Sequence, residues 1–172
     1  MNQLRELQAP IKAKYKEHPE SALVTHRAEG KLGHDITCEV QTKDGVVVAG
    51  LHPAAGGTGE YVCSGDMLLQ ALAACTGVTM NAVATAMGLE LRHATIKASG
   101  EIDYRGTLGV SREVSVGFKN IHLEFNLDTD APTEKIEKLI ELTERYCVVF
   151  QTLNHKPEMT VSHQQIDSFG KV

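Results

Sequence analysis

Two cysteines, Cys75 and Cys147, have positions that could support thiol redox chemistry. Each falls in a segment that predicts a helix, and the two lie far apart in the chain. If helix packing brings the sulfurs together, one thiolate can attack an O–O or S–S bond and become a sulfenic acid. The other thiol can then resolve that acid as a disulfide. A helical cysteine is more often a packed core residue, so a purely structural interpretation competes with this one.

The surroundings of Cys75 in the sequence are strongly apolar. No charged residue occurs between Asp66 and Glu90, and alanine, leucine, methionine and valine fill most of that interval. A thiol among apolar groups is driven towards its neutral, unreactive form. A reactive Cys75 therefore needs a cation, which must come from elsewhere in the fold.

Residues 64–88 predict the helix that carries Cys75. Ser64 can cap its first turn, Asp66 places a negative charge near the helix start, and Gly88 is typical of the position just past a helix end. Because this segment has no polar face, we expect the helix to be buried along most of its length. Its glycine, threonines and asparagine make it too polar for a membrane span.

Residues ~22–49 show the alternation of apolar and polar side chains that is typical of strands. Ile36, Cys38 and Val40 share one side, and a turn at residues 43–45 separates them from a valine run. We interpret Cys38 as a small core residue of this sheet.

Residues 94–102 and 114–127 also alternate, and they predict a long antiparallel hairpin. The apolar parity switches at residues 119–120. One extra residue in a strand produces such a switch, so the pattern predicts a β-bulge there.

Residues 128–147 predict a second helix. Asp130 or Thr133 can cap it, and its apolar residues, with Cys147 near the end, trace a single face. Unlike the first helix, this one should have one side in solvent.

The remaining segments complete an α+β pattern. Residues 2–17 predict an amphipathic helix, kinked or shortened at Pro10, and residues 158–162 predict a last short strand. The glycine-rich residues 52–63 predict an irregular loop before the first central helix. Strands that precede, separate and follow two helices, with a hairpin in the middle, are typical of α+β architecture and not of a doubly wound parallel sheet.

The composition is that of an ordinary soluble protein. The 172 residues, 42% hydrophobic and 23% charged, predict one compact domain over residues 1–172, with residues 1–20 as a helical extension. The net charge of -5 argues against a nucleic-acid binder or an anionic-membrane binder. The amino terminus has no apolar signal core, so we expect a cytoplasmic protein whose cysteines form no structural disulfide framework.

Three other kinds of site are weaker interpretations. The glycines before the helix match no phosphate-binding loop pattern. His26, His34 and Cys38 form the nearest cluster of metal-ligating types, with spacings that match no zinc pattern, and we expect no metal. A cysteine–histidine acyl-transfer site would use His93, His122 or His155, but no local motif supports any of them.

Two strings of the sequence are similar to motifs of a known family. GGTG followed by S-x-x-x-LLQALAACTGVTM, with ERYCVVFQTL further on, resembles the OsmC/Ohr family of osmotically inducible and organic-hydroperoxide-resistance proteins. The similarity spans residues 56–162 and includes the order of strands and helices. It is greatest to the general OsmC-like branch of that family.

The resemblance implies a fold, an activity and partners. The fold would be an OsmC-like α+β fold with antiparallel strands wrapped around two central helices, in an intertwined homodimer with its sites near the subunit interface. Cys75 would be the peroxidatic thiol and Cys147 the resolving thiol of a peroxidase that reduces hydroperoxides, organic ones especially. An external dithiol would regenerate the enzyme, and no metal, flavin or haem is implied.

The resemblance also suggests the cation and its partner. An arginine from the early strands is matched best by Arg27, and the carboxylate that orients it is matched by Asp66. This sequence departs from the family at Gly65, where the hydroperoxide-specialised branch has a glutamate, and at Val148, where the family has a proline. We expect Cys147 to lie within a continuous helix as a result. These departures also motivate an alternative function, an OsmC-like scaffold that binds a small ligand or senses redox state.

Overall fold

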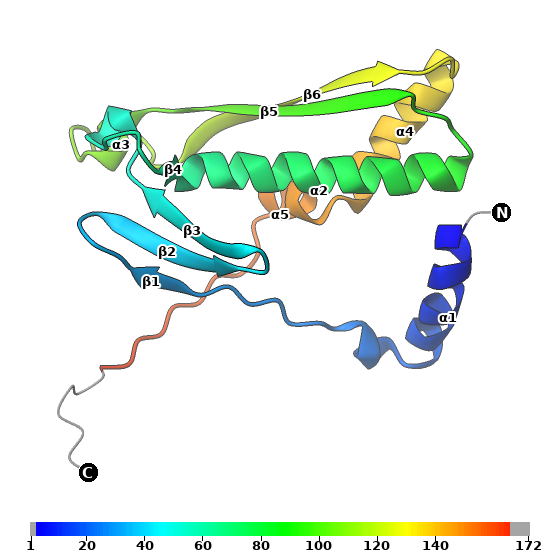
Figure 1. Cartoon of the computed structure of the whole chain (residues 1–172), viewed down its shortest axis with the longest axis horizontal. Helices are drawn as coiled ribbons and strands as arrows, with labels where there is room; N and C mark the ends of the chain where they lie inside the picture. The colour runs from blue at the N-terminus through cyan, green and yellow to red at the C-terminus, as the bar shows by residue number, and fades with distance from the viewer. Residues whose placement is uncertain (1–2, 166–172) are drawn as a thin grey trace, which may run out of the picture.

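The computed structural model describes residues 3–165. It has α+β architecture with two sheets, which confirms the predicted fold class. The elements in chain order are α1 (Gln3–Glu17), η1 (Pro19–Ala22), β1 (Gly30–Leu32), β2 (Thr37–Thr42), β3 (Gly45–Gly50), η2 (Pro53–Ala55), β4 (Val62–Cys63), α2 (Ser64–Met87), β5 (His93–Ile102), α3 (Tyr104–Thr107), β6 (Phe118–Asp128), α4 (Thr133–Tyr146) and α5 (Val148–Asn154). The long helix α2 is central, with the β5–β6 hairpin along one side and the β1–β4 sheet at its amino-terminal end (Figure 1).

Helix α2 begins and ends close to the predicted positions. Gly88 terminates it in the left-handed conformation, with φ of 67°, and its N–H bonds back to carbonyls of the last turn. The predicted cap at Ser64 is wrong, because Cys63 is the N-cap residue and makes no side-chain capping hydrogen bond. Cys63 is also the last residue of β4, so the chain passes from strand to helix without a separate capping residue.

The β5–β6 hairpin confirms the predicted pairing and the predicted bulge, but the second strand is shorter than predicted. It begins at Phe118, and residues 114–117 lie outside any strand. The strands pair antiparallel from His93 opposite Asp128 to Glu101 opposite Asn120, and the next pair is Ile102 with Phe118. Lys119 is therefore the extra residue, inside the pair of positions where the apolar parity switches. The apolar side chains of both strands face α2 as a result.

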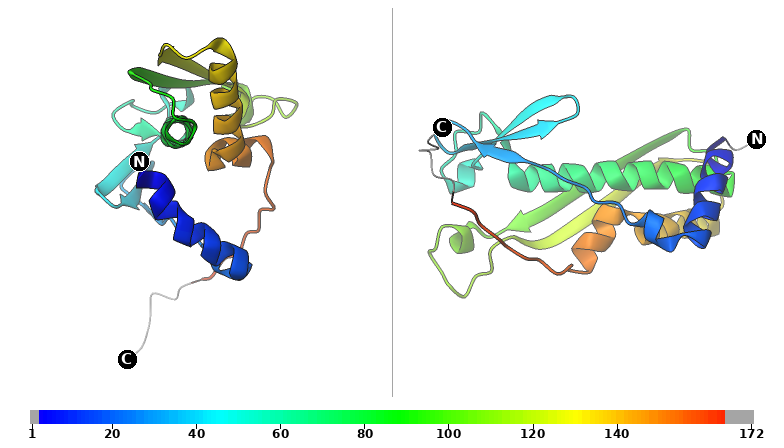
Figure 2. Two further views of the ribbon diagram at one scale, coloured as in Figure 1. Left: turned by 90° about the vertical axis from the view of Figure 1, so that its right-hand side faces the viewer. Right: turned by 90° about the horizontal axis from the view of Figure 1, so that it is seen from below.

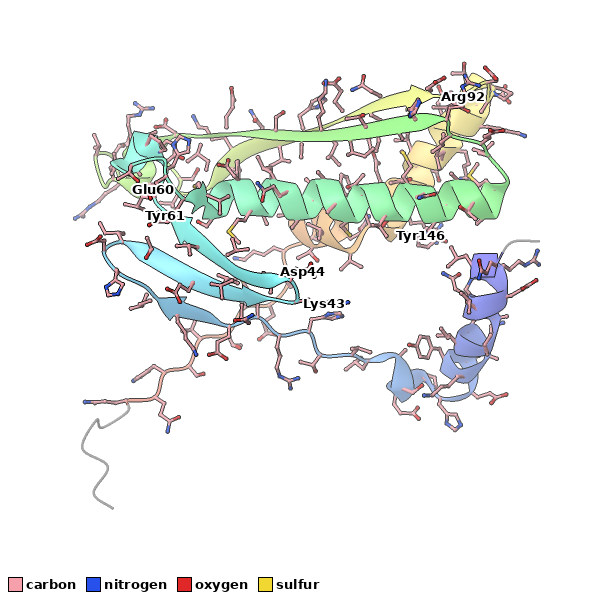
Figure 3. The ribbon with its side chains drawn as sticks, in the orientation of Figure 1. Lys43, Asp44, Glu60, Tyr61, Arg92 and Tyr146 are labelled. Atoms are coloured by element: carbon pink, nitrogen blue, oxygen red, sulfur yellow. The ribbon has the colours of Figure 1, made fainter. Side chains whose placement is uncertain are left out.

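The β1–β4 sheet is mostly antiparallel. Strands β2 and β3 form a hairpin through Lys43 and Asp44, as the turn signal predicted, and Figure 3 labels both residues at the tip of this hairpin. The short strand β4 then pairs parallel to β3. The glycine-rich connection between them, with η2 in it, is irregular as predicted.

Helix α4 packs against α2 with one face, as its amphipathic pattern predicted. Its buried residues are Leu139 and Thr143, and Leu139 lies in a core cluster with Met80 and Ala84 of α2. Neither predicted cap is used, because Pro132 is the N-cap residue. The Asp130 carboxylate instead accepts hydrogen bonds from Arg92, the residue before β5. Figure 3 labels Arg92 at that end of the hairpin.

The expectation that α2 is buried along most of its length is wrong for the single chain. Only four of its 24 residues are buried: Leu72, Thr76, Met80 and Ala84. These four recur once per helical turn on the side that faces the hairpin and α4. The opposite side is uncovered, and the Val78 side chain there is 74% exposed. By length and composition alone, α2 could cross a membrane.

The two ends of the chain differ from the predictions in opposite ways. Helix α1 contains Pro10 and still continues to Glu17, with no buried residue, so the proline does not shorten it. It lies apart from the sheets in both views of Figure 2. The strand predicted at residues 158–162 is absent, because residues 156–165 have no regular structure. A strand needs a partner edge, and the described chain brings none to this segment.

The bulge generates a prediction about Gly100. A methyl group there would lie 2.6 Å from Cδ1 of Phe118 and 2.8 Å from the backbone carbonyl oxygen of Asn120. We expect Gly100→Ala to lower the free energy of unfolding by about 1–3 kcal/mol, since the crowding involves fixed backbone. Urea unfolding measures the change. Ser99→Ala, at an exposed neighbour, is the control, and equal stability of the two variants would contradict the assigned register.

Candidate functional site

The carboxyl-terminal helices are broken at Cys147. Helix α4 ends at Tyr146, and Cys147 itself has extended backbone angles, φ of −74° and ψ of 110°, before α5 begins at Val148. The expectation that Cys147 lies within a continuous helix is therefore wrong. The chain breaks here without the family's proline because the Cys147 sulfur caps α5, accepting a hydrogen bond from the Phe150 N–H at 3.5 Å.

This break places the Cys147 side chain in the core, against the middle of α2. Cys147 is fully buried, and its Sγ lies 3.5 Å from the Thr76 hydroxyl oxygen. Cys75, the neighbour of Thr76 in the sequence, is half-buried, and its thiol is within hydrogen-bonding reach of the Cys147 thiol. The fold thus brings the two predicted cysteines together.

The pKa of the Cys75 thiol is lowered, although no cation causes the change. Burial is the largest single influence and acts to raise the pKa. Several hydrogen bonds outweigh it: from the backbone amide of Val149, the Cys147 thiol, the backbone amide of Val148 and the Thr79 hydroxyl. Neutral donors therefore perform the task for which the sequence seemed to require a cation.

The amides of Val148 and Val149 can reach Cys75 because they open α5. The first N–H groups of a helix have no partner within the helix, and they point outward from its end. In a continuous helix these same N–H groups would bond to carbonyls one turn earlier. Nothing in the sequence indicates this contribution, since every residue type except proline has the same backbone amide.

Thr76 and Thr79 are site residues that the sequence did not single out. Both are on α2, Thr76 next to Cys75 and Thr79 one turn further along on the same side. A signal for Thr76 was available, because it interrupts the apolar positions Leu72, Met80 and Ala84 with a hydroxyl group.

The two charged residues proposed for the site lie elsewhere in the single chain. Asp66 is exposed in the first turn of α2, about 14 Å along the axis from Cys75 at about 1.5 Å per residue, and on the opposite side of the helix. Arg27 is exposed on the irregular segment between η1 and β1. Within residues 3–165, neither is among the groups that shift the Cys75 pKa.

The other cysteines and a cavity beside β2 and β3 are separate from this site. Cys38 lies on β2 and Cys63 at the start of α2, both half-buried. A cavity of about 420 Å³ lies between β2, β3 and the glycine-rich loop, lined by His34, Tyr61 and neighbours but by neither Cys75 nor Cys147. Figure 3 shows Glu60 and Tyr61 of its wall near the amino-terminal end of α2. Among the described residues, no group of three or more histidine, cysteine, aspartate or glutamate side chains could hold a metal ion.

Comparison with known proteins decides the family. The sequence profile described as OsmC-like protein matches residues 57–162, which is more than half of the chain and includes both cysteines of the site. The chain belongs to the OsmC-like family. No curated protein matches it in sequence.

Solved structures share the fold of this OsmC-like chain. An OsmC-like protein from Mycoplasma pneumoniae superposes with a TM-score of 0.67 at 17% identity, over 77% of this chain and 89% of the other. An organic hydroperoxide resistance protein from Elizabethkingia anophelis, with thiocyanate bound, gives 0.63 at 17% identity over 78% and 91%. One from Legionella pneumophila gives 0.59 at 20% identity over 77% and 90%. At these identities the likeness establishes the fold.

The contribution of the Val148 amide to the Cys75 thiolate can be tested by substitution. A proline has no N–H, so Val148→Pro removes one donor from Cys75, while Val148→Ala retains it. Proline suits this position, because Val148 opens a helix and Cys147 before it is already extended. We expect the proline variant to have a higher Cys75 pKa and several-fold slower alkylation by iodoacetamide at pH 7, since the thiolate is the nucleophile.

The measurement is the pH dependence of Cys75 alkylation, followed by peptide mass spectrometry. In the wild-type protein the midpoint should lie below that of a cysteine in a short peptide, which is about 8.5. Identical profiles for the proline and alanine variants would show that the Val148 amide does not support the thiolate.

Proposed function

We propose that this OsmC-like protein is a thiol-dependent peroxidase that reduces organic hydroperoxides through Cys75 and Cys147. The observation that carries the proposal is the meeting of two thiols from distant helices, with the pKa of Cys75 lowered at their point of contact. Burial raises the pKa of a thiol, so the lowered pKa of Cys75 reflects the hydrogen-bond donors that surround it. Organic hydroperoxide resistance proteins among the structural neighbours support the same class of activity.

The proposed chemistry uses the two sulfurs in different roles. The half-buried Cys75 thiolate attacks the distal oxygen of the hydroperoxide, which breaks the O–O bond and leaves a Cys75 sulfenic acid and, after protonation, an alcohol. The Cys147 thiolate then attacks the Cys75 sulfur, forms the disulfide and releases hydroxide, which becomes water. An external dithiol reduces the disulfide to two thiols and is itself oxidised. Thiols alone supply the electrons.

The substrate class is argued from the surface beside Cys75. Val148 of α5, whose amide reaches the Cys75 thiol, has a side chain that is 71% exposed. This apolar side chain beside a half-buried thiol favours a hydroperoxide with an apolar organic group.

A homodimer is part of the proposal, because the uncovered side of α2 needs a partner. Exposed residues recur once per turn along that side, none of them is charged and three are apolar, and a soluble protein rarely leaves so long an uncharged stripe in water. They are Ala71, Ala74, Val78, Asn81 and Thr85. We propose that a second copy covers the stripe, and that Arg27 and Asp66 approach a thiol site only across this interface. Cytoplasmic localisation is proposed with it.

The peroxidase proposal predicts which cysteines are oxidised. Reduced protein mixed with cumene hydroperoxide should lose the Cys75 and Cys147 thiols together as one disulfide, within seconds. Cys75→Ser should lose turnover by more than about a hundredfold, because it removes the nucleophile. Cys147→Ser should be oxidised once at Cys75 and then stop.

Cys38→Ser is the matched control, since Cys38 is also half-buried and lies on a strand away from the site. Thiol counting by intact and peptide mass provides the readout. Oxidation of Cys75 no faster than that of Cys38 would overturn the peroxidase proposal, and a ligand-binding scaffold would then be the better account.

The dimer proposal predicts an effect of charge on the exposed side of α2. Val78→Glu should convert a dimer to a monomer at micromolar concentration, because it would bury an unpaired carboxylate in an apolar interface. Light scattering after size exclusion gives the mass. Glu137→Lys, on the exposed side of α4, should leave the mass unchanged. A wild-type protein that is monomeric at every concentration contradicts the dimer.

A further inference from the structure

The Thr76 hydroxyl is a polar group at an apolar position. Thr76 is 1% exposed and lies between Leu72 and Met80 in the buried row of α2, where an aliphatic side chain would be expected. Burying a hydroxyl group costs free energy unless it is hydrogen-bonded. The buried Thr76 hydroxyl therefore needs a hydrogen-bond partner.

That partner is a sulfur atom and not the backbone. Three other helical threonines donate to the carbonyl four residues earlier: Thr85 to Asn81, Thr143 to Leu139 and Thr152 to Val148. The Thr76 hydroxyl oxygen instead lies 3.5 Å from Cys147 Sγ, in a side-chain contact buried on both sides. The same sulfur accepts the Phe150 N–H at 3.5 Å.

We infer that Thr76 is a positioning residue for Cys147. The Thr76 hydroxyl donates a hydrogen bond to Cys147 Sγ and stabilises that sulfur as the leaving thiolate when an external dithiol reduces the Cys75–Cys147 disulfide. A thiolate has no proton, so in that state the hydroxyl group is the donor. In a dry environment such a bond to a charged atom is stronger than in water. The inference rests on the thiol pair of the proposed function. It states that the reductant attacks the Cys75 sulfur of the disulfide and that Cys147 is the sulfur that leaves.

The difference in burial between the two cysteines also favours attack of the reductant at Cys75. Cys147 is 0% exposed, whereas Cys75 is half-buried, so an incoming thiolate reaches the Cys75 sulfur first. It forms a mixed disulfide with Cys75, and the S–S electron pair passes to Cys147. The second thiol of the dithiol then attacks the reductant sulfur that is bonded to Cys75. This step releases the Cys75 thiolate and leaves the reductant as a cyclic disulfide. A better-stabilised leaving thiolate makes the first of these steps faster.

The test uses a disulfide formed without peroxide, so that it stands apart from the peroxidase test. Wild type, Thr76→Val and Thr76→Ser are oxidised with diamide, the Cys75–Cys147 bond is verified by peptide mass, and its reduction by dithiothreitol is followed at pH 7. Valine matches threonine in shape and lacks the hydroxyl group. We expect Thr76→Val to be reduced roughly three- to tenfold more slowly, and Thr76→Ser to retain the wild-type rate.

Thr143→Val is the matched control, because Thr143 is equally buried and its hydroxyl bonds to the Leu139 carbonyl. It should be reduced at the wild-type rate. Equal rates for Thr76→Val and wild type, or the same slowing in Thr143→Val, would overturn the inference. If thermal unfolding shows that Thr76→Val does not fold, Thr76→Ala replaces it. Failure of cumene hydroperoxide to oxidise Cys75 would overturn the peroxidase proposal and leave this result standing.

Discussion

The break in the backbone at Cys147 is the constraint on which the site depends. It ends α4, turns the chain by one extended residue and starts α5, so that a sulfur and two free amides face the middle of α2. Each of these contributions would vanish in a continuous helix, where the amides would be consumed by internal hydrogen bonds. The rest of the fold holds α2 opposite this break. The β5–β6 hairpin and α4 hold α2 by its buried row, and this fixes the height at which Cys75 meets the break.

Elements whose signal extends over many residues could be predicted from the sequence, whereas features that depend on one side chain or on a distant partner could not. Periodic patterns act over many residues, so α2, the amphipathic α4 and the hairpin were predictable, and the parity switch located the bulge at Lys119. Caps depend on single side chains with competing partners. Asp130 was unavailable as a cap because Arg92 engages it. The predicted last strand failed because strand formation needs an edge, which no local pattern reports.

For the site, residue types identified Cys75 and Cys147 but not what surrounds them. The sequence argument searched for a cation, since charged side chains are the visible means of lowering a thiol pKa. The structure uses backbone amides and threonine hydroxyl groups, which composition cannot single out. The resemblance led us to expect a proline where Val148 stands, but valine has an N–H group, and this amide is one of the donors that lower the pKa of Cys75. Support from neutral dipoles within the protein is less sensitive to dissolved salt than support from an exposed charge.

The uncovered side of α2 has a consequence for how this subunit persists in the cell. In the proposed homodimer, α2, which has only four buried residues in the single chain, would gain much of its stability from the second copy on its other side. The free energy of unfolding would then follow mass action: dilution would weaken the fold and abundance would strengthen it. The thermal midpoint would become a function of expression level, and chains made in small amounts would be the ones most exposed to proteolysis.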